Sequence, residues 1–586
     1  MAFKLGELAN APEPLGAALR ACKRHFQSAF FFSALVNVLY LAPTLYMLQV
    51  YDRVMSTGGV MTLIFITIVV VLALGTLTLL DNVRSRLLVR AGLRIDRLLA
   101  GEVLGRLISR ARAGPGAPRV GQAMREFDTF RQTLAGPGML SLFDAPWTPI
   151  YLGFCFILHP LLGLITLLGG VILLTLAILN ERSVKPKLQK AGEAAAAAYM
   201  AQETAANSAE VVKALGMRNA LVARQLTDRT VATDMQAQAA FAGGKYTGAI
   251  KFVRLALQSL ALGLGAYLAI ERQISGGAVI AASVLLSRAL QPLEQVVGAW
   301  SGVVQGRAAF QTLVDLFTEY PPEAPRTQLP PPKGLVQVEQ VSVRIGEAMI
   351  LKGVSMSIQP GEVVGLIGPS GAGKTTLARV IAGAVPPDYG TVRLDGADLK
   401  DWESDRLAKY VGYLPQDSIL FHGTIRDNIS RFQAFTGTPA AEIDEKVIVA
   451  AQAAGAHEMI LRLPKGYDSM LGVGGRGLSS GQSQRIAFAR AIYGEPAMIV
   501  LDEPNAHLDA EGEGALMRTL LGLKARGAAV LLVAHRTGIL NAADKMIVLR
   551  DGAIEMFGPR DEVAARLQAQ EKGARPGPRP TVVSGG

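Results

Sequence analysis

Long stretches without a charged residue constrain the fold of this chain more than any other feature. Residues 25–51 and 54–80 contain no Asp, Glu, Lys or Arg. As a helix, each would be about 40 Å long, which exceeds the roughly 30 Å of hydrocarbon in a bilayer. Half of all residues are hydrophobic and only 18% are charged, so the composition excludes a disordered chain and predicts a membrane protein.

Further apolar stretches extend this pattern. Residues 145–180 are also uncharged but contain His159-Pro160, which predicts two helices joined by a tight turn. Two stretches that are weaker candidates for membrane spans follow, at about 250–270 and 274–297. The first apolar stretch is too long for a cleaved signal peptide, so we expect residues 1–24 to remain as a cytoplasmic segment. We expect six membrane spans, at about 27–50, 60–80, 141–158, 161–180, 250–270 and 274–297.

The net charge of +11 is confined to the first half of the chain. Residues 1–333 hold 32 Lys and Arg against 20 Asp and Glu, whereas residues 334–586 hold 27 against 28. Two long connections between spans carry most of the basic residues, with 11 Arg in 82–144 and nine Lys or Arg in 181–249. Basic residues near spans stay on the cytoplasmic side. The pattern therefore predicts a cytoplasmic N-terminus and a cytoplasmic second half, and no nucleic-acid partner.

One charge falls inside the expected sixth span. Arg288 lies four residues before Pro292. An arginine within a span is by default part of a transport pathway, but snorkelling or pairing with Glu294 agrees equally well with the sequence. We expect Pro292 to kink or end the local helix.

The composition changes after a proline-rich linker, 321–333. Short β-branched runs separated by Gly and Asp follow, which is typical of an α/β domain. We therefore expect a helical membrane domain over 25–320 and an α/β domain over 334–570. The small polar residues of 571–586 predict a disordered tail.

The second half contains a complete phosphate-binding loop. A predicted buried strand, Val363–Ile367, leads into Gly-Pro-Ser-Gly-Ala-Gly-Lys-Thr-Thr. Small residues let successive backbone N–H groups turn toward phosphate oxygens, while Lys374 adds a cation and Thr375 offers its hydroxyl to Mg²⁺. ATP and Mg²⁺ are the expected ligands. The expected ATP-binding residues of this loop are Gly368, Ser370, Gly371, Ala372, Gly373, Lys374, Thr375 and Thr376.

Two further predicted strands lead to residues that suit nucleotide hydrolysis. Met498–Leu501 ends at Asp502-Glu503, and Ala529–Val533 precedes His535. Asp502 would hold Mg²⁺ through water, and Glu503 would polarise the attacking water as general base. His535 is a candidate contact to the γ-phosphate.

The segment from Leu478 to Arg485, Leu-Ser-Ser-Gly-Gln-Ser-Gln-Arg, resembles the signature motif of ABC transporters. Gln416 matches the Q-loop glutamine of that family, which serves catalysis and the Mg²⁺ site, and Asp509 matches its D-loop. The resemblance implies that two such domains face head to tail, with ATP between the P-loop of one and the signature motif of the other. Since this chain has one membrane half and one ATPase half, it implies a homodimer. The signature residues implied in ATP binding are Ser479, Gly481 and Gln482.

Three positions depart from the family pattern. Ser480 replaces the usual first glycine of the signature pair, Ser483 replaces a common arginine, and Ile345 stands where many members stack a tyrosine on adenine. None of these changes removes a catalytic group, so we expect hydrolysis to survive.

The membrane half resembles type I secretion ATPases, closest to the exporters of proteases, lipases and repeats-in-toxin proteins. Four stretches carry this resemblance: Leu45–Val54, Phe143–Ile150, Ala209–Met217 and Arg288–Gln295. It implies an ABC transporter type 1 membrane domain that exports an unfolded polypeptide with a C-terminal signal across the inner membrane of a Gram-negative bacterium. The implied partners are a periplasmic membrane-fusion adaptor, an outer-membrane channel, the secreted polypeptide and membrane lipid. The N-terminal peptidase domain of bacteriocin exporters is not expected.

An exporter of lipid or drug-like small molecules with the same fold is the main alternative, because ATPase motifs do not distinguish cargo classes. The four membrane stretches argue against it. A DNA-associated ATPase would explain a basic chain, but six spans and an ATPase half near neutrality argue against that class. Importers usually keep their membrane and ATPase parts on separate chains.

Overall fold

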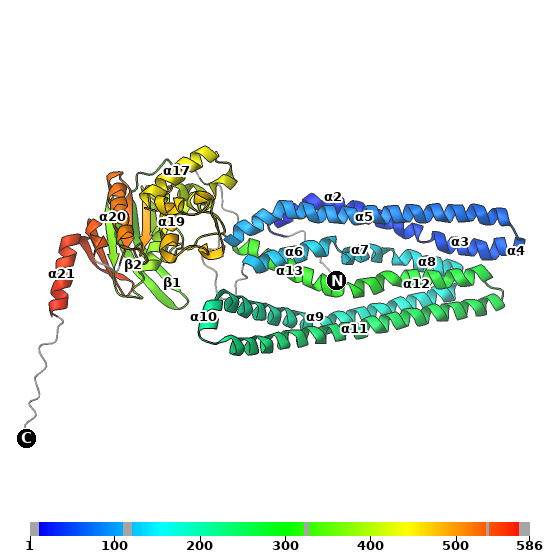
Figure 1. Cartoon of the computed structure of the whole chain (residues 1–586). Helices are drawn as coiled ribbons and strands as arrows, with labels where there is room; N and C mark the ends of the chain where they lie inside the picture. Colours follow the sequence, from blue (N-terminus) through cyan, green and yellow to red (C-terminus); the bar gives the residue numbers. More distant parts are fainter. Residues whose placement is uncertain (1–10, 109–119, 322–325, 327, 535–537, 574–586) are drawn as a thin grey trace, which may run out of the picture. The chain divides into compact units, whose positions relative to one another are not determined.

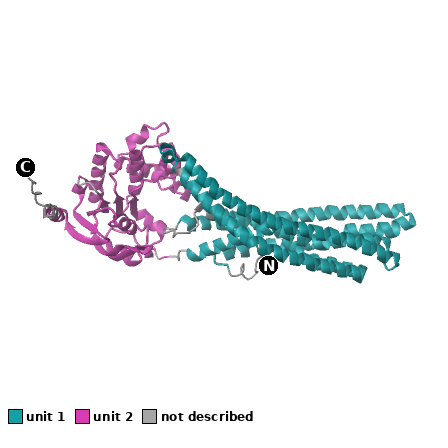
Figure 2. Cartoon of the chain, turned by 90° about the horizontal axis from the view of Figure 1, so that it is seen from below, with its two compact units in different colours: residues 1–322 teal, residues 323–586 magenta. Residues whose placement is uncertain are grey.

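A computed structural model describes residues 11–108, 120–321, 326, 328–534 and 538–573. The chain divides into two compact units, Met1–Pro322 and Glu323–Gly586 (Figure 2).

The first unit is built of helices (Figure 1). Six helical segments of the described residues are long and apolar enough to cross a membrane, which confirms the predicted number of spans. These segments are Leu15–Thr57, Val60–Ile108, Ala123–Leu158, Pro160–Ala206, Arg218–Ile270 and Gly276–Gly298. The helices are α2 (Leu15–Leu39), α3 (Ala42–Gln49), the π-helix η1 (Val50–Val54), α4 (Met55–Thr57), α5 (Val60–Ile108), α6 (Val120–Ala135), α7 (Pro137–Asp144), the 3₁₀ turn η2 (Ala145–Trp147), α8 (Thr148–Leu158), α9 (Pro160–Asn207), α10 (Ala209–Ala214), α11 (Arg218–Ile270), α12 (Gly276–Gly298) and α13 (Trp300–Glu319).

Several of these helices are far longer than a bilayer is thick. Helix α11 has 53 residues, and at about 1.5 Å per residue it is more than twice as long as the hydrocarbon core. Helix α9 packs along it, as Figure 1 shows. The alanine-rich segment after Glu193 lies within α9. The long basic connections therefore continue the spans as helices.

The two prolines at which a helix break was expected, Pro160 and Pro292, differ in their effect on the helices. Helix α8 ends at Leu158 and α9 begins at Pro160, so the tight turn expected at His159-Pro160 is present. Pro292, in contrast, does not end α12, which continues to Gly298.

The predicted alternative that Arg288 pairs with Glu294 is wrong. Glu294 instead forms an ion pair of 2.5 Å with Arg254 of α11. The Arg288 guanidinium lies 4.2 Å from the ring centre of Tyr40 and donates a hydrogen bond of 3.2 Å to Gln291. The charges of α12 are therefore balanced by neighbouring helices and an aromatic ring rather than by each other.

A buried polar cluster joins the first three spans. Arg84 of α5 donates hydrogen bonds to Asp144, at 2.5 Å, and to Ser33, at 2.9 Å. Asn37 donates to the same Asp144 oxygen at 2.8 Å, and the Tyr151 hydroxyl donates to the Asn37 carbonyl at 2.7 Å. Because a charge in a membrane interior is costly unless it is paired, this cluster holds α2, α5, α7 and α8 in one arrangement.

The second unit is an α/β fold around a mostly parallel sheet. Its strands are β1 (Val336–Ile345), β2 (Ala348–Ile358), β3 (Val363–Ile367), β4 (Tyr389–Leu394), β5 (Ala397–Asp398), β6 (Val411–Leu414), β7 (Gly423–Thr424), β8 (Met470–Leu471), β9 (Met498–Asp502), β10 (Ala529–Val533), β11 (Lys545–Arg550) and β12 (Ala553–Pro559). Its helices are α14 (Lys374–Ile381), α15 (Ser404–Tyr410), α16 (Ile425–Ile429), α17 (Ala440–Ala453), α18 (His457–Leu461), α19 (Ser480–Ile492), α20 (Ala510–Ala525) and α21 (Arg560–Gly573).

The central sheet has the strand order β12-β11-β3-β10-β9-β6, beside a four-stranded sheet, β2-β1-β4-β5, and the short pair β7-β8. Strands β11, β3, β10, β9 and β6 run parallel. Their alternate side chains enter two different hydrophobic clusters, Val363 one and Val364 the other. Burial on both faces explains why these strands are continuous apolar runs in the sequence.

Some predicted boundaries differ from the observed elements. Helix α2 begins at Leu15, within the expected cytoplasmic segment 1–24. Helix α21 extends to Gly573, so the first residues of the expected tail 571–586 are helical and the remainder lies outside the described residues. Part of the linker 321–333 also lies outside them.

Candidate functional site

The phosphate-binding loop joins β3 to α14 and requires glycine at two points. A Cβ atom at Gly368 would lie 2.1 Å from the Leu549 carbonyl oxygen, so β11 leaves no space for a side chain. Gly373 has a φ of +97° in the left-handed region and caps α14. Left-handed backbone is strained for residues with a Cβ. These glycines place the start of α14 where its free N–H groups suit an anion.

Lys374 folds back over the loop in this structure. Its Nζ donates hydrogen bonds to the carbonyls of Gly368, at 2.9 Å, and Pro369, at 3.0 Å, and the residue is buried. Burial lowers the pKa of Lys374, while the nearby Glu503 and Asp502 act in the opposite direction. Both contacts are to neutral acceptors, so a phosphate would be a stronger partner for this ammonium group.

The remaining predicted residues of the loop differ in exposure. Ser370 and Gly371 are exposed, Thr375 and Thr376 are half-buried, and Ala372 is buried. The loop therefore presents residues 369–371 to solvent, whereas Ala372 packs in the core.

Asp502 and Gln416 follow neighbouring parallel strands. Leu501 pairs with Leu414, so Asp502 at the end of β9 and Gln416 after β6 leave the sheet at the same edge. Asp502 is 1% exposed, and neither of its buried carboxylate oxygens accepts a hydrogen bond. Burial raises the pKa of Asp502, and proximity of the Thr375 hydroxyl counters it.

This carboxylate fits the expected Mg²⁺ ion. A buried carboxylate without hydrogen-bond partners, next to a hydroxyl group, offers the oxygen ligands that Mg²⁺ favours. Among the described residues no three His, Cys, Asp or Glu side chains cluster as a metal site. Water and nucleotide phosphates would therefore supply the other ligands.

Glu503 occupies an unusual backbone conformation. Its φ is +51°, in the left-handed region, and its N–H donates to the Val533 carbonyl at 3.0 Å. Strained backbone of this kind persists where surrounding contacts fix it and is frequent at active sites. The predicted His535 lies just after β10 but outside the described residues.

The signature residues form the N-terminus of α19. Ser479 and Gln482 build a capping box, in which the Ser479 hydroxyl accepts from the Gln482 N–H and the Gln482 side chain accepts from the Ser479 N–H. A Cβ atom at Gly481 would lie 2.8 Å from the His507 carbonyl oxygen. Gly481 is therefore needed for close packing against the loop after Glu503.

Gln484 and Arg485 attach the signature helix to the same loop. The Gln484 side chain donates to the Pro504 carbonyl at 2.6 Å and accepts from the His507 N–H at 3.0 Å. Arg485 donates to Asp509 at 2.5 Å, and the Asp509 carboxylate also caps α20 through the Gly512 N–H. The sequence predicts no separate role for Gln484 and Arg485, although a buried polar residue in a helix, such as Gln484, is a signal for one.

The two expected halves of the nucleotide site stay separate within one chain. Among the described residues, the hydrogen bonds and ion pairs of 479–485 lead to the loop 503–509 or within the segment itself. Those of the P-loop residue Lys374 remain within its own loop.

Ile345 is 60% exposed at the end of β1. An apolar side chain at this open position is free to cover a base.

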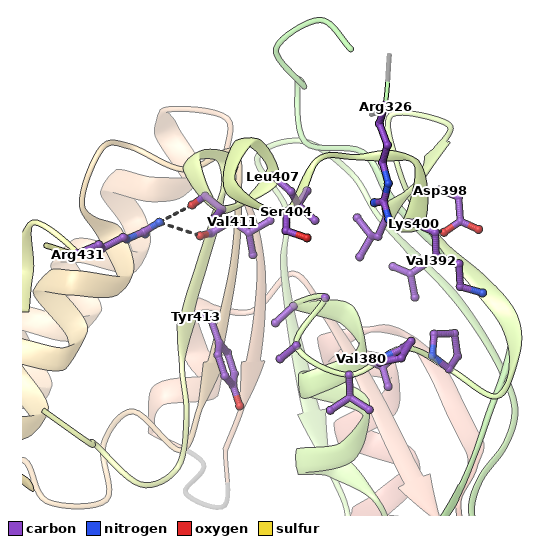
Figure 3. A pocket seen from close by; sticks show the side chains of 18 of the residues that line it. Arg326, Val380, Val392, Asp398, Lys400, Ser404, Leu407, Val411, Tyr413 and Arg431 are labelled. Atoms are coloured by element: carbon purple, nitrogen blue, oxygen red, sulfur yellow. Dashed lines mark hydrogen bonds between the residues drawn. The ribbon is translucent and has the colours of Figure 1, made fainter. Parts of the chain in front are cut away.

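A cavity of about 580 Å³ lies elsewhere in the second unit (Figure 3). Its lining includes Val380, Leu407 and Tyr413 but no residue of the phosphate-binding loop. Arg431 borders it and donates hydrogen bonds to the carbonyls of Ala408 and Val411. Burial and the neighbouring Arg490 lower the pKa of Arg431 to about 10. Since no residue of the phosphate-binding loop lines the cavity, it is not the nucleotide site.

Two family models match the chain. The model described as "ABC transporter transmembrane region" matches residues 28–293, and the model described as "ABC transporter" matches residues 351–506.

Curated relatives share this organisation. The type I secretion system ATP-binding protein PrsD of Rhizobium meliloti (strain 1021) is 39% identical over 557 residues, with 94% of each chain covered. The cyclolysin secretion/processing ATP-binding protein CyaB of Bordetella pertussis is 30% identical, with 92% of this chain and 77% of that protein covered. Among solved structures, a bacterial Atm1-family ABC exporter with ATP bound matches with a TM-score of 0.80 and 23% identity, covering 95% of this chain and 99% of the other. The similarity to this solved structure shows that the two proteins share a fold.

Proposed function

This chain belongs to the ABC transporters, among the type I secretion ATP-binding proteins, and from this premise we propose that it exports a polypeptide from the cytoplasm by ATP hydrolysis. The observation that carries the proposal is the similarity to PrsD, which extends through the membrane half as well as the ATPase half. Membrane sequences differ between cargo classes more than ATPase motifs do, so similarity over both halves favours polypeptide cargo over lipid or drug-like molecules.

The proposed hydrolytic site assigns a role to each polar side chain. Lys374 exchanges its two carbonyl contacts for the β- and γ-phosphates, which are stronger acceptors. Thr375, Asp502 and Gln416 would hold Mg²⁺, which neutralises charge that develops on the phosphates. Glu503, fixed by its backbone, accepts a proton from the attacking water. His535 contacts the γ-phosphate.

A homodimer completes this site. Ser479, Gly481 and Gln482 of one copy would bind the phosphates held by the P-loop of the other. The support is that the hydrogen bonds of Lys374 stay within its own loop, while those of Ser479 and Gln482 stay within the signature segment. The loop 503–509, attached to the signature helix by Gln484, would report occupancy of one site to the catalytic glutamate beside it.

The remaining assignments concern the cellular setting. The basic connections support a cytoplasmic location for the N-terminus and the ATPase unit. We assign the chain to the inner membrane of a Gram-negative bacterium, in contact with membrane lipid, a periplasmic membrane-fusion adaptor and an outer-membrane channel. The cargo is an unfolded polypeptide with a C-terminal signal.

Deletion of the gene tests this function. A polypeptide exporter should leave at least one protein missing from the culture medium, and plasmid-borne wild-type chain should restore it. A Lys374→Met chain at equal abundance should not. An unchanged set of secreted proteins, with altered membrane lipids or drug tolerance, would favour the small-molecule alternative.

A further inference from the structure

Hydrogen bonds join segments at or next to the three short turns at one end of the membrane unit. These turns lie between α4 and α5, α8 and α9, and α11 and α12, at the same end of the helices (Figure 1). The Asp52 carboxylate accepts hydrogen bonds from the Ser275 hydroxyl at 2.5 Å and from the Gly277 N–H at 2.7 Å. The π-helix η1, which precedes the first of these turns, is therefore attached to the start of α12.

The second turn reaches the same place. His159 Nδ1 accepts a hydrogen bond from the Leu161 N–H at 3.2 Å, so the ring proton of a neutral imidazole lies on Nε2. Nε2 then donates to Gln273 Oε1 at 2.9 Å. The π-helix η1 and the turn between α8 and α9 thus both contact residues 273–277, around the start of α12.

The local backbone is shaped for the Asp52 contact. Asp52 lies in the π-helix Val50–Val54, a form that inserts one residue into a helical turn and is frequent at functional sites. Its carboxylate meets free N–H groups at the start of the 23-residue helix α12, where negative charge is favoured.

Gly277 is the residue that permits this approach. A Cβ atom there would lie 2.6 Å from Asp52 Oδ1, which is a severe clash. At the adjacent Gly276 a Cβ atom would meet nothing within 4 Å. Since neither glycine has a left-handed φ, the Asp52 carboxylate, rather than backbone strain, explains the need for glycine at 277.

We propose that Asp52, Ser275 and Gly277, with His159 and Gln273, form a latch that holds the exit end of the membrane helices closed until cargo passes. The inference rests on the proposed function, because the charge pattern places these turns on the side that cargo reaches last. Opening the exit requires separation of helices whose turns this latch joins, so its strength sets how often the exit opens at rest.

The first test uses the matched glycines and a natural cysteine. Cys155 is 1% exposed and packs in one cluster with Leu285 and Ala289 of α12, near the latch end of α8. Leu41 of the first span packs in the same cluster, so the reaction of Cys155 with a membrane-impermeant maleimide, added outside spheroplasts of a Cys22→Ser background, reports separation of the first span from α12. We expect Gly277→Ala and Asp52→Ala to raise the rate about tenfold, the effect of losing hydrogen bonds to a charged group. Gly276→Ala should leave the rate unchanged. Equal rates in all variants would overturn the latch.

The second test locks the turns together. Asp52→Cys with Gly277→Cys places two sulfurs where carboxylate and backbone now touch, within the reach of a disulfide. Oxidised cells should stop secreting the cargo identified by gene deletion, and a reductant should restore secretion. Continued secretion by fully cross-linked protein would overturn the latch while leaving the proposed function intact. If deletion shows that the chain exports no polypeptide, the maleimide rates still test the latch.

Discussion

The side-chain amide of Gln484 donates a hydrogen bond of 2.6 Å to the carbonyl oxygen of Pro504. This contact joins the helix that begins at the signature motif to the loop that follows Glu503, the proposed general base. In the proposed dimer these two segments serve different nucleotides. Gln484 is therefore positioned to couple one nucleotide site to the other.

Replacement of Gln484 by Ala should uncouple these segments. It leaves the buried Pro504 carbonyl without its Gln484 partner, at a cost of about 1–3 kcal/mol, and removes the acceptor of the His507 N–H. We expect kcat for ATP to fall about tenfold or more, with a smaller change in KM, measured as steady-state ATPase in detergent or nanodiscs. Gln452→Ala, an exposed position on α17, is the control. Equal activity of both variants would argue against the coupling role.

The two small residues of the signature pair should differ in their sensitivity to substitution. Gly481→Ala places a Cβ atom 2.8 Å from the His507 carbonyl and should displace the signature loop, lowering ATPase activity about tenfold or more. Ser480→Gly restores the usual family residue, and we expect less than about a twofold change, because a serine at the start of a helix costs little. A severe loss in Ser480→Gly would show that the serine has a role of its own.

Asp509 should contribute stability in a pH-dependent way. Its hydrogen bond from the Gly512 N–H, followed by that from Arg485, lowers the pKa of its carboxyl group. The ionised form is therefore favoured in the folded protein. Its contribution to the free energy of unfolding is present above the unfolded pKa of about 3.9 and is lost as the pH falls through the lower pKa of the folded protein. Asp509→Ala should lower the unfolding temperature at pH 7, and the difference from wild type should shrink below about pH 4. Asp509→Asn, which keeps a capping side chain, should lose less at pH 7. A pH-independent difference for Asp509→Ala would contradict this account.

Asp144 should be essential for the membrane fold. Asp144→Ala leaves Arg84 buried without its close partner, and breaking a buried pair costs about 3–5 kcal/mol. We expect a marked loss of monodisperse protein after detergent extraction, with a milder loss for Asp144→Asn, which keeps an acceptor for the Arg84 guanidinium. Asp468→Asn removes the exposed partner of Arg426 and should have little effect. Equal yields of Asp144→Ala and Asp468→Asn would show that the cluster does not hold the spans.

Much of this architecture could be predicted from the sequence, because it depends on local pattern. Six apolar lengths specify six spans, and the strands β3 and β10 coincide with the predicted Val363–Ile367 and Ala529–Val533. The phosphate-binding loop is equally local, since its glycines and Lys374 are contiguous.

Contacts between distant segments could not be predicted in the same way. Glu294 pairs with Arg254 rather than Arg288, because helix packing decides which faces meet. The need for glycine at 277 comes from Asp52, which is 225 residues away in the sequence. Likewise, the reason for Gly481 is the His507 carbonyl on another loop. Spacing along one segment carries no information about such partners.

ATP-driven movement of a polypeptide by this chain is the central claim, and transport in inverted inner-membrane vesicles tests it most directly. Vesicles with the wild-type chain and its adaptor should engage the C-terminal segment of the cargo identified by gene deletion and protect it from protease when ATP is added. Glu503→Gln should bind ATP but hydrolyse it at least about 100-fold more slowly, the usual contribution of a general base, and should not sustain repeated rounds of protection. Glu511→Gln, an exposed glutamate on α20, should behave as wild type. ATP-dependent protection that continues undiminished in Glu503→Gln vesicles would contradict the account.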